Sequence, residues 1–165
     1  MNAYYSSLVS LPAVTTDGVR VELMANIGLA ADVKAAIPYG CEGVGLFRSE
    51  FVFMGRQDIP TEDDQFEYYK EAVQSCNGKL CVIRTMDIGG DKPLAYLNIP
   101  QEDNPFLGWR AVRISLQRRD LFMPQLKAIL RAGVYGKAAI MVPMVINVAE
   151  ILKVKEFIET AEVEL

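Results

Sequence analysis

The chain has 165 residues, 51% of them hydrophobic, and a formal net charge of −4. This length is sufficient for one domain with a sizeable core, and the acidic balance argues against a general nucleic-acid-binding surface. No apolar stretch approaches the roughly 20 residues that span a bilayer, and the N-terminus lacks the charged start and apolar core of a secretory signal.

The cysteine and histidine content limits the kinds of catalytic and metal site that the chain can contain. The three cysteines are odd in number and lack the spacing of a zinc site, so we expect reduced thiols and a cytoplasmic protein. The sequence contains no histidine. Histidine acid–base catalysis, a phosphohistidine and a histidine–metal site are therefore excluded within this chain.

Short apolar runs recur along the chain and are predicted to be strands. They follow a leader over residues 1–18, which we expect to be extended or turn structure, with a turn at Asp17-Gly18. The strands are expected near 21–27, 43–47, 80–87 and 139–146.

Helices are predicted between these runs. The clearest begins at Thr61, which can cap it, carries three acidic residues in its first turn, and ends at Asn77-Gly78. Asn104-Pro105 combines a cap with a first-turn proline, which predicts a helix over NPFLGWRAVRISLQ. The other helices are expected near Asp32 to Tyr39, from Asp120 to Gly133, and after Asn147.

Strands that alternate with helices predict right-handed parallel βαβ units and an α/β fold. Four such units are visible in the sequence. A closed (βα)8 barrel typically takes about 250 residues, so this chain is long enough for half of one, a partial TIM barrel of about four βα units. An open, doubly wound sheet is the alternative that the pattern alone leaves open.

Arginines fall at similar places in this scheme. Arg48 follows the apolar run GVGLF, Arg84 lies late in the strand LCVIRTMD, and Arg110 falls early in the helix predicted from Asn104. Side chains at the carboxyl ends of parallel strands converge on one edge of the sheet, where ligands bind. Because guanidinium groups match phosphate and carboxylate oxygens two at a time, these arginines indicate a site for a small, multiply charged anion.

Charged residues after Arg84 could complete such a site. The segment CVIRTMDIGGDKP places Asp87 where it could orient an arginine, and Lys92 where it could add a positive charge after a glycine turn. A single arginine is more often a surface charge or half of a salt bridge, and for Arg48 alone that interpretation is favoured. Arg131 is expected on the surface of an outer helix.

Six segments of the chain resemble one enzyme family. They are EGVGLFRSEFVFM, PTEDDQF, VIRTMDIGGDKPL, NPFLGWRAVRI, QLKAILRA and IMVPM. In this order and at these intervals, from about Val21 to about Ile151, they closely resemble Enzyme I of bacterial sugar phosphotransferase systems, the phosphoenolpyruvate-protein phosphotransferases. The resemblance implies that residues 19–165 are the N-terminal half of that family's phosphoenolpyruvate-binding TIM barrel domain, with 1–18 as an N-terminal leader.

The resemblance also implies a substrate and the residues that bind it. In that family the arginines of the LFRSEF-like and VIRTMD motifs bind phosphoenolpyruvate, and they match Arg48 and Arg84. The wall of the family's active site includes residues that match Asp87, Lys92 and Arg110. The family passes phosphate from phosphoenolpyruvate to a histidine on a separate domain, and then to a small carrier protein for sugar uptake.

The chain departs from this family in its catalytic groups. The family's magnesium-binding acidic residues and its catalytic cysteine, which protonates the pyruvate enolate, lie in the second half of the barrel. None of Cys41, Cys76 or Cys81 occupies a matching motif. We therefore expect no catalytic residue and no metal ligand in this chain, and Mg²⁺ only in the parent enzyme. We also expect a piece of a longer protein, or the product of a truncated gene, that is inactive by itself.

Two alternatives remain open. Phosphoenolpyruvate synthase and pyruvate phosphate dikinase share the barrel and its arginines, although the compact interval between GGDKPL and NPFLGWR favours Enzyme I. The second alternative is a non-catalytic half-barrel that dimerises or inhibits its full-length counterpart. Because a half-barrel exposes two edge strands and part of an apolar interior, we expect a homodimer or larger assembly, with no nucleic-acid partner and no membrane insertion.

Overall fold

Four short strands form one parallel sheet. They are β1 (Ala25–Ile27), β2 (Val44–Arg48), β3 (Cys81–Arg84) and β4 (Ala138–Met141). The strands pair in sequence order, β1-β2-β3-β4, and every pairing is parallel. The computed structural model describes residues 3–89, 94, 96–97, 99–100 and 102–165, and the structural statements refer to these residues.

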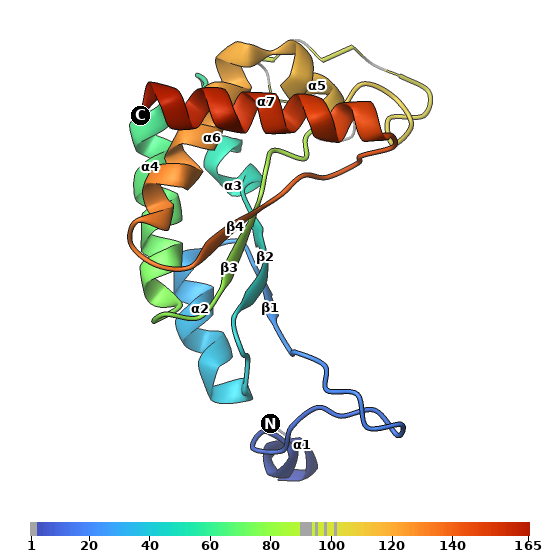
Figure 1. Cartoon of the computed structure of the whole chain (residues 1–165), viewed down its shortest axis with the longest axis vertical. Helices are drawn as coiled ribbons and strands as arrows, with labels where there is room; N and C mark the ends of the chain where they lie inside the picture. Colours follow the sequence, from blue (N-terminus) through green and yellow to red (C-terminus); the bar gives the residue numbers. More distant parts are fainter. Residues whose placement is uncertain (1–2, 90–93, 95, 98, 101) are drawn as a thin grey trace.

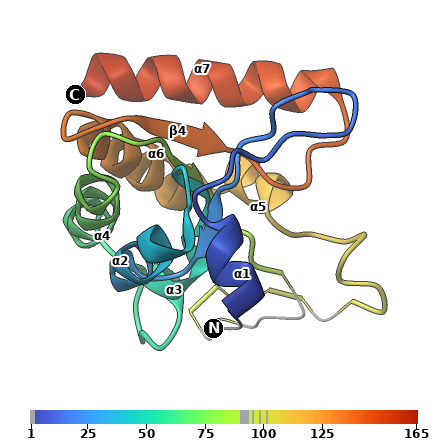
Figure 2. The same ribbon diagram turned by 90° about the horizontal axis from the view of Figure 1, so that it is seen from below.

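Helices connect the strands, as parallel pairing requires. They are α1 (Ala3–Leu8), α2 (Ala30–Ala36), α3 (Glu50–Phe53), α4 (Glu62–Ser75), α5 (Val112–Gln117), α6 (Arg119–Gly133) and α7 (Val148–Glu164), with a 3-10 turn η1 at Ile37–Tyr39. Helices α2, α4 and α6 lie on one side of the sheet (Figures 1 and 2). A doubly wound sheet instead reverses its strand order and carries helices on both faces. The structure confirms the α/β prediction and is consistent with about half of a (βα)8 barrel.

The burial of β3 shows which face of the sheet lies against the helices. Cys81 and Ile83 are fully buried in the main hydrophobic cluster, together with Tyr69 of α4. The alternate residues Val82 and Arg84 are only half-buried. Because successive side chains of a strand point to opposite faces, Arg84 belongs to the face that α2, α4 and α6 do not cover.

Helix α7 packs on α5 and α6 through a second apolar cluster. The buried members of this cluster are Val112, Phe122, Met123, Leu126, Val154, Phe157 and Ala161. Its central contact joins the rings of Phe122 and Phe157, whose centroids lie 5.4 Å apart. This packing confirms the predicted helix after Asn147. None of the helices in the described part of the chain is both long and apolar enough to cross a membrane.

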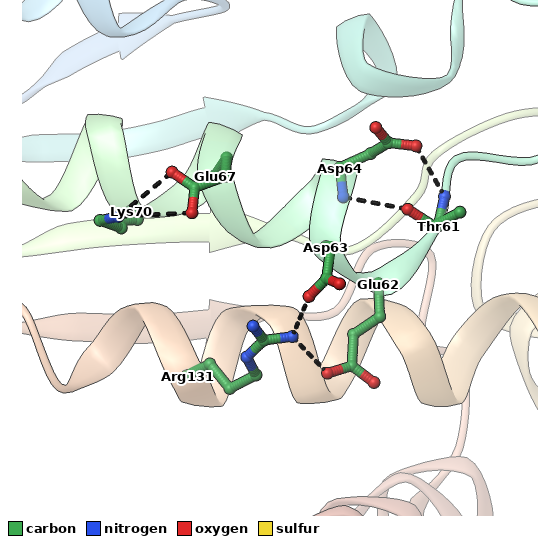
Figure 3. A network of polar contacts seen from close by, with 7 residues as sticks. All are labelled: Thr61, Glu62, Asp63, Asp64, Glu67, Lys70 and Arg131. Carbon is green, nitrogen blue, oxygen red and sulfur yellow. Dashed lines mark hydrogen bonds and ion pairs between the residues drawn. The ribbon is translucent and has the colours of Figure 1, made fainter.

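Thr61 caps α4 as predicted (Figure 3). Its hydroxyl accepts a hydrogen bond from the Asp64 backbone N–H at 3.1 Å, and Asp64 Oδ2 accepts one from the Thr61 N–H at 3.0 Å. This reciprocal pair satisfies backbone groups that the start of a helix leaves without partners. The helix ends at Ser75, and the residues Asn77 and Gly78 follow with φ of 49° and 82°. The predicted stop is therefore confirmed.

Arg131 joins α6 to the start of α4 (Figure 3). Its Nη1 lies 2.6 Å from Glu62 Oε1 and 2.8 Å from Asp63 Oδ1. Its Cζ lies 4.1 Å from the centroid of the Phe66 ring. The sequence predicted only a helix-surface position for Arg131. The structure differs because α4 and α6 pack against each other, which brings the acidic first turn of α4 beside α6.

The helix predicted from Asn104 begins too early. Helix α5 starts only at Val112, because Asn104-Pro105 opens a turn whose closing N–H reaches the Asn104 carbonyl at 3.0 Å. Proline suits the second position of such a turn as well as the first turn of a helix. Ala111 then adopts a φ of 50°, outside the helical region, so Arg110 lies before α5 rather than within it.

The predicted leader also differs from the structure. Residues 1–18 include the short helix α1, Ala3–Leu8, in place of the predicted extended or turn structure. Its 6 residues are too few to show a helical hydrophobic period. The turn at Asp17-Gly18 is present, with Gly18 at a φ of 87°. Strand β1 begins at Ala25, later than predicted.

Candidate functional site

The predicted arginines of β2 and β3 meet at the carboxyl edge of the sheet. In the parallel pairing of these strands, the Cα atom of Arg48 is the register partner of the Cα atom of Arg84. Each arginine is the last residue of its strand. The structure therefore places the two arginines side by side at the ends of neighbouring strands.

Arg48 is exposed to solvent. Its Cζ lies 5.1 Å from the centroid of the Phe51 ring, a distance at which a guanidinium group is attracted to the face of an aromatic ring. The Phe51 ring packs closely on Gly28, just after β1, where an added Cβ would lie 2.4 Å from Phe51 Cε2. Gly28 thus leaves room for the aromatic ring that supports Arg48.

Carboxylates hold Arg84 on two sides. Its Nη2 donates to Glu50 Oε1, and its Nη1 lies 3.0 Å from Asp87 Oδ2. The Arg84 side chain remains 16% exposed, and its Nε has no hydrogen-bond partner among the described residues. Since a guanidinium group carries five N–H donors, Arg84 keeps donors for a further acceptor while the carboxylates fix its orientation.

Asp87 connects Arg84 to Arg110. Its Oδ1 lies 3.0 Å from Arg110 Nη2, so each Asp87 oxygen pairs with a different guanidinium group. Arg110 is buried, and its Cζ lies 4.7 Å from the centroid of the Phe106 ring. An added Cβ at Gly89 would lie 2.6 Å from Arg110 Cβ, so the first glycine of the GG pair permits this close approach. The orienting role predicted for Asp87 agrees with this geometry.

The charges of this cluster favour an anion. Among the described residues, this part of the molecule holds three guanidinium groups, those of Arg48, Arg84 and Arg110, and two carboxylates, those of Glu50 and Asp87. Three positive and two negative charges leave a formal charge of +1. The remaining positive charge and the exposed Arg48 suit a small anion such as a phosphate or carboxylate. The fifth predicted site residue, Lys92, lies outside the described residues.

Sequence reasoning missed Glu50 and Gln125. Glu50 is buried and pairs with Arg84, which is 34 positions away in the chain. Its only sequence signal was its place in the RSEF segment, two residues after Arg48. Gln125 is a buried polar residue on the otherwise apolar face of α6, and its amide contacts the ends of both arginine-bearing strands. A polar residue at a core position was the signal that could have identified it.

The described residues provide no evident metal centre. No group of three or more Cys, Asp or Glu side chains in that part of the chain could hold a metal ion. The two carboxylates at the arginine cluster, Glu50 and Asp87, both pair with guanidinium groups. They therefore do not form a carboxylate set suited to Mg²⁺.

Comparison with known proteins agrees with the sequence motifs. The family described as PEP-utilising enzyme, PEP-binding domain, matches residues 2–165. A phosphoenolpyruvate-protein phosphotransferase of Haemophilus influenzae is 54% identical over 163 residues, which cover 99% of this chain and 28% of the relative. Proteins of the same name from Staphylococcus aureus and Geobacillus stearothermophilus are 55% identical over 142 residues and 52% identical over 153 residues.

The fraction of each sequence that the alignments cover shows how far the similarity extends. The Staphylococcus alignment covers 86% of this chain and 25% of the relative, and the Geobacillus alignment covers 93% and 26%. The chain thus spans about a quarter of the length of these relatives. The resemblance to phosphoenolpyruvate-protein phosphotransferases is confirmed. Because the family match extends over nearly every residue, the chain belongs to the PEP-utilising enzymes and lies within their PEP-binding domain.

Proposed function

We propose that this chain supplies part of the phosphoenolpyruvate site of a phosphoenolpyruvate-protein phosphotransferase, in which Arg48 and Arg84 bind the phosphate of the substrate. The observation that carries this proposal is the pairing of Arg48 with Arg84 at the carboxyl ends of β2 and β3. Ligands of barrel enzymes bind at this edge of the sheet. The identity of 52–55% to enzymes of that name supports the choice of substrate.

The two arginines contribute differently to the proposed site. Arg48 is exposed, so its guanidinium group can approach the phosphate without breaking an ion pair with any described residue. Arg84 is held by Glu50 and Asp87, so little side-chain freedom remains to be lost when an anion binds. Arg110 pairs with Asp87 and so helps to orient it. Lys92, which lies outside the described residues, is proposed from the sequence motif to bind the substrate as well.

The reaction of the parent enzyme also needs groups that this chain lacks. We propose that the phosphoryl group leaves the enol oxygen of phosphoenolpyruvate and is accepted by a histidine nitrogen on a separate domain, before it passes to a phosphocarrier protein for sugar uptake. A magnesium ion held outside this chain would neutralise charge on the phosphoryl oxygens. Here Arg48 and Arg84 bind the phosphate and stabilise its charge. The chain alone is expected to be inactive.

Two further properties belong to this proposal. A phosphotransferase that exchanges phosphate with a cytoplasmic carrier is itself cytoplasmic. This location agrees with the odd number of cysteines, from which we expect reduced thiols. Homodimer formation is supported by the sheet, because among the described residues β1 and β4 each pair with a single strand and keep one edge open to a second chain. The same edges would serve the alternative function of a non-catalytic half-barrel that associates with a full-length counterpart.

A hybrid enzyme tests the proposal. In the Haemophilus influenzae relative, this chain would replace the 163 residues with which it aligns. We expect the hybrid to transfer phosphate from labelled phosphoenolpyruvate to the phosphocarrier protein. A hybrid that folds, as judged by circular dichroism, but transfers no phosphate would contradict the proposed function.

A further inference from the structure

Gln125 of α6 contacts the carboxyl ends of both arginine-bearing strands. Its Oε1 accepts a hydrogen bond from the Met86 backbone N–H at 2.9 Å. Its Nε2 donates to Ser49 Oγ at 3.2 Å and to the Tyr69 hydroxyl at 3.0 Å. The side chain is 1% exposed, so these contacts form without competition from solvent. Both amide hydrogens and the amide oxygen of Gln125 are therefore used.

The partners of Gln125 lie directly beside the proposed phosphate-binding residues. Ser49 follows Arg48 in the chain and precedes Glu50. Met86 immediately precedes Asp87 and lies two positions after Arg84. One amide group thus connects the two segments whose side chains form the arginine–carboxylate cluster.

The contact with Met86 lies just beyond the last backbone hydrogen bond between β3 and β4. The Thr85 N–H donates to the Met141 carbonyl of β4 at 2.9 Å, and the next N–H, that of Met86, donates to Gln125 instead. A buried backbone N–H without an acceptor is costly, so Gln125 satisfies a group that the sheet no longer pairs. It also fixes the direction in which the chain leaves β3 towards Asp87.

A second buried glutamine, Gln65 of α4, also contacts Tyr69. The Tyr69 hydroxyl donates to Gln65 Oε1 at 3.1 Å, and Gln65 Nε2 donates to the Pro60 carbonyl at 3.2 Å. Burial raises the pKa of the Tyr69 hydroxyl above its ordinary value, so the group stays protonated and able to donate. The chain of contacts runs from α4 through Tyr69 to Gln125 and ends at the two strands.

Packing alone does not explain a polar side chain at this position. The neighbouring buried residues of α6, Leu126 and Ile129, are apolar, and a similar residue at position 125 would avoid the desolvation of an amide. We propose that Gln125 is a positioning residue, which holds the ends of β2 and β3 so that Arg48 and Arg84 converge on one anion. This inference rests on the proposed function of those arginines.

Matched substitutions of two buried glutamines separate positioning from stability. Gln125→Met and Gln65→Met each remove an amide from the same network and keep a similar volume, and the two residues are 1% and 0% exposed. Only Gln125 contacts Ser49 and Met86, whereas Gln65 contacts Tyr69 and the Pro60 carbonyl. Both variants would be made in the hybrid enzyme and in the 165-residue chain.

The measurements are the KM for phosphoenolpyruvate of the hybrid and the Nε–H nuclear magnetic resonance signals of Arg48 and Arg84 in the chain. We expect Gln125→Met to raise KM roughly tenfold and to shift or broaden the arginine signals. Gln65→Met should leave both readouts near wild type, even where it lowers the free energy of unfolding. If the two variants change KM and the signals alike, in proportion to lost stability, Gln125 has no positioning role.

The remaining outcomes are also decisive. An inactive wild-type hybrid would contradict the proposed function, whereas the arginine signals of the chain would still decide the role of Gln125. If Gln125→Met does not fold, Ser49→Ala replaces it, because this change removes one contact of Gln125 and keeps the glutamine. A smaller shift of the Arg48 and Arg84 signals in Ser49→Ala would support the inference, and unchanged signals would overturn it.

Discussion

Arg48 and Arg84 are register partners across β2 and β3, but of the two only Arg84 is held by carboxylates of the described residues. Arg84 pairs with Glu50 and Asp87, whereas Arg48 is exposed and lies over the Phe51 ring. The pair therefore combines one oriented guanidinium group with one that can adjust to a ligand. Because Asp87 holds Arg84, we expect loss of this carboxylate to affect the fold as well as the site.

Asp87→Asn should destabilise the fold. The substitution removes the negative charge that Arg84 and the buried Arg110 share, and loss of one partner from a buried ion pair costs about 3–5 kcal/mol. We expect the free energy of unfolding, measured by urea denaturation, to fall by about 3 kcal/mol. The exposed Asp103 provides a control, Asp103→Asn. Equal stability of the two variants would contradict a shared role of Asp87.

The cap of α4 should make the free energy of unfolding decrease at acid pH. Hydrogen bonds from the Thr61 backbone N–H and side chain, and then from Arg56, hold the pKa of Asp64 below its ordinary value of 3.8. A lowered pKa in the folded state means that the stabilisation is complete above the pKa of the unfolded chain and is lost as pH falls through the folded value.

Asp64→Asn should therefore remove part of the acid sensitivity. We expect the wild-type chain to lose more free energy of unfolding than the variant between about pH 6 and pH 3. Urea denaturation at a series of pH values measures this difference. Parallel pH profiles for the two chains would show that Asp64 makes no such contribution.

Arg131→Ala should lower stability without affecting the substrate site. The change removes contacts with Glu62, Asp63 and the Phe66 ring, and because these groups are partly exposed we expect a loss of about 1 kcal/mol. Thermal or urea unfolding measures the loss. The KM of the hybrid for phosphoenolpyruvate should stay at its wild-type value, and a raised KM would mean that the α4–α6 contact also shapes the site.

Local signals in the sequence predicted the helices and strands, and the arginines at the ends of two strands. Thr61 caps α4 through residues within one turn, so its role is visible in the sequence. Arg48 and Arg84 each end an apolar run, and parallel pairing brings them together. In contrast, Asn104-Pro105 satisfies the rules for both a turn and a helix start, and contacts distant in the chain decide between them.

The partners of these arginines could not be predicted in the same way. Glu50 meets Arg84 across 34 positions, and Gln125 meets Ser49 across 76. Such contacts depend on strand register and on the rotation of α6, neither of which has a local sequence signal. An isolated carboxylate or amide in a sequence therefore does not reveal which strand end it supports.

Self-association should follow from the two outer strands. Strands β1 and β4 each have one pairing edge without a strand among the described residues, and Leu46, Val82 and Met141 are only half-buried. We expect light scattering to report a dimer or a larger assembly at micromolar concentration. A stable monomer over the whole concentration range would contradict this expectation.

Binding of the phosphate of phosphoenolpyruvate is the role that we propose for Arg48 and Arg84. It is tested most directly by KM and kcat of the hybrid enzyme carrying Arg48→Ala or Arg84→Lys, with Arg20→Ala as the control. Arg20 pairs with Glu42 on the surface, before the amino end of β2. Lysine keeps the positive charge of Arg84 but cannot make the two parallel hydrogen bonds of a guanidinium group, so Arg84→Lys is not conservative. Arg48→Ala removes the charge as well.

We expect each site variant to fold and to lose about 1.5–3 kcal/mol of substrate or transition-state binding, seen as a fall in kcat/KM of roughly 10-fold to 150-fold. Arg20→Ala should retain wild-type kinetics. Folded Arg48→Ala and Arg84→Lys enzymes with wild-type kcat/KM would contradict the account and leave both arginines with a structural role only.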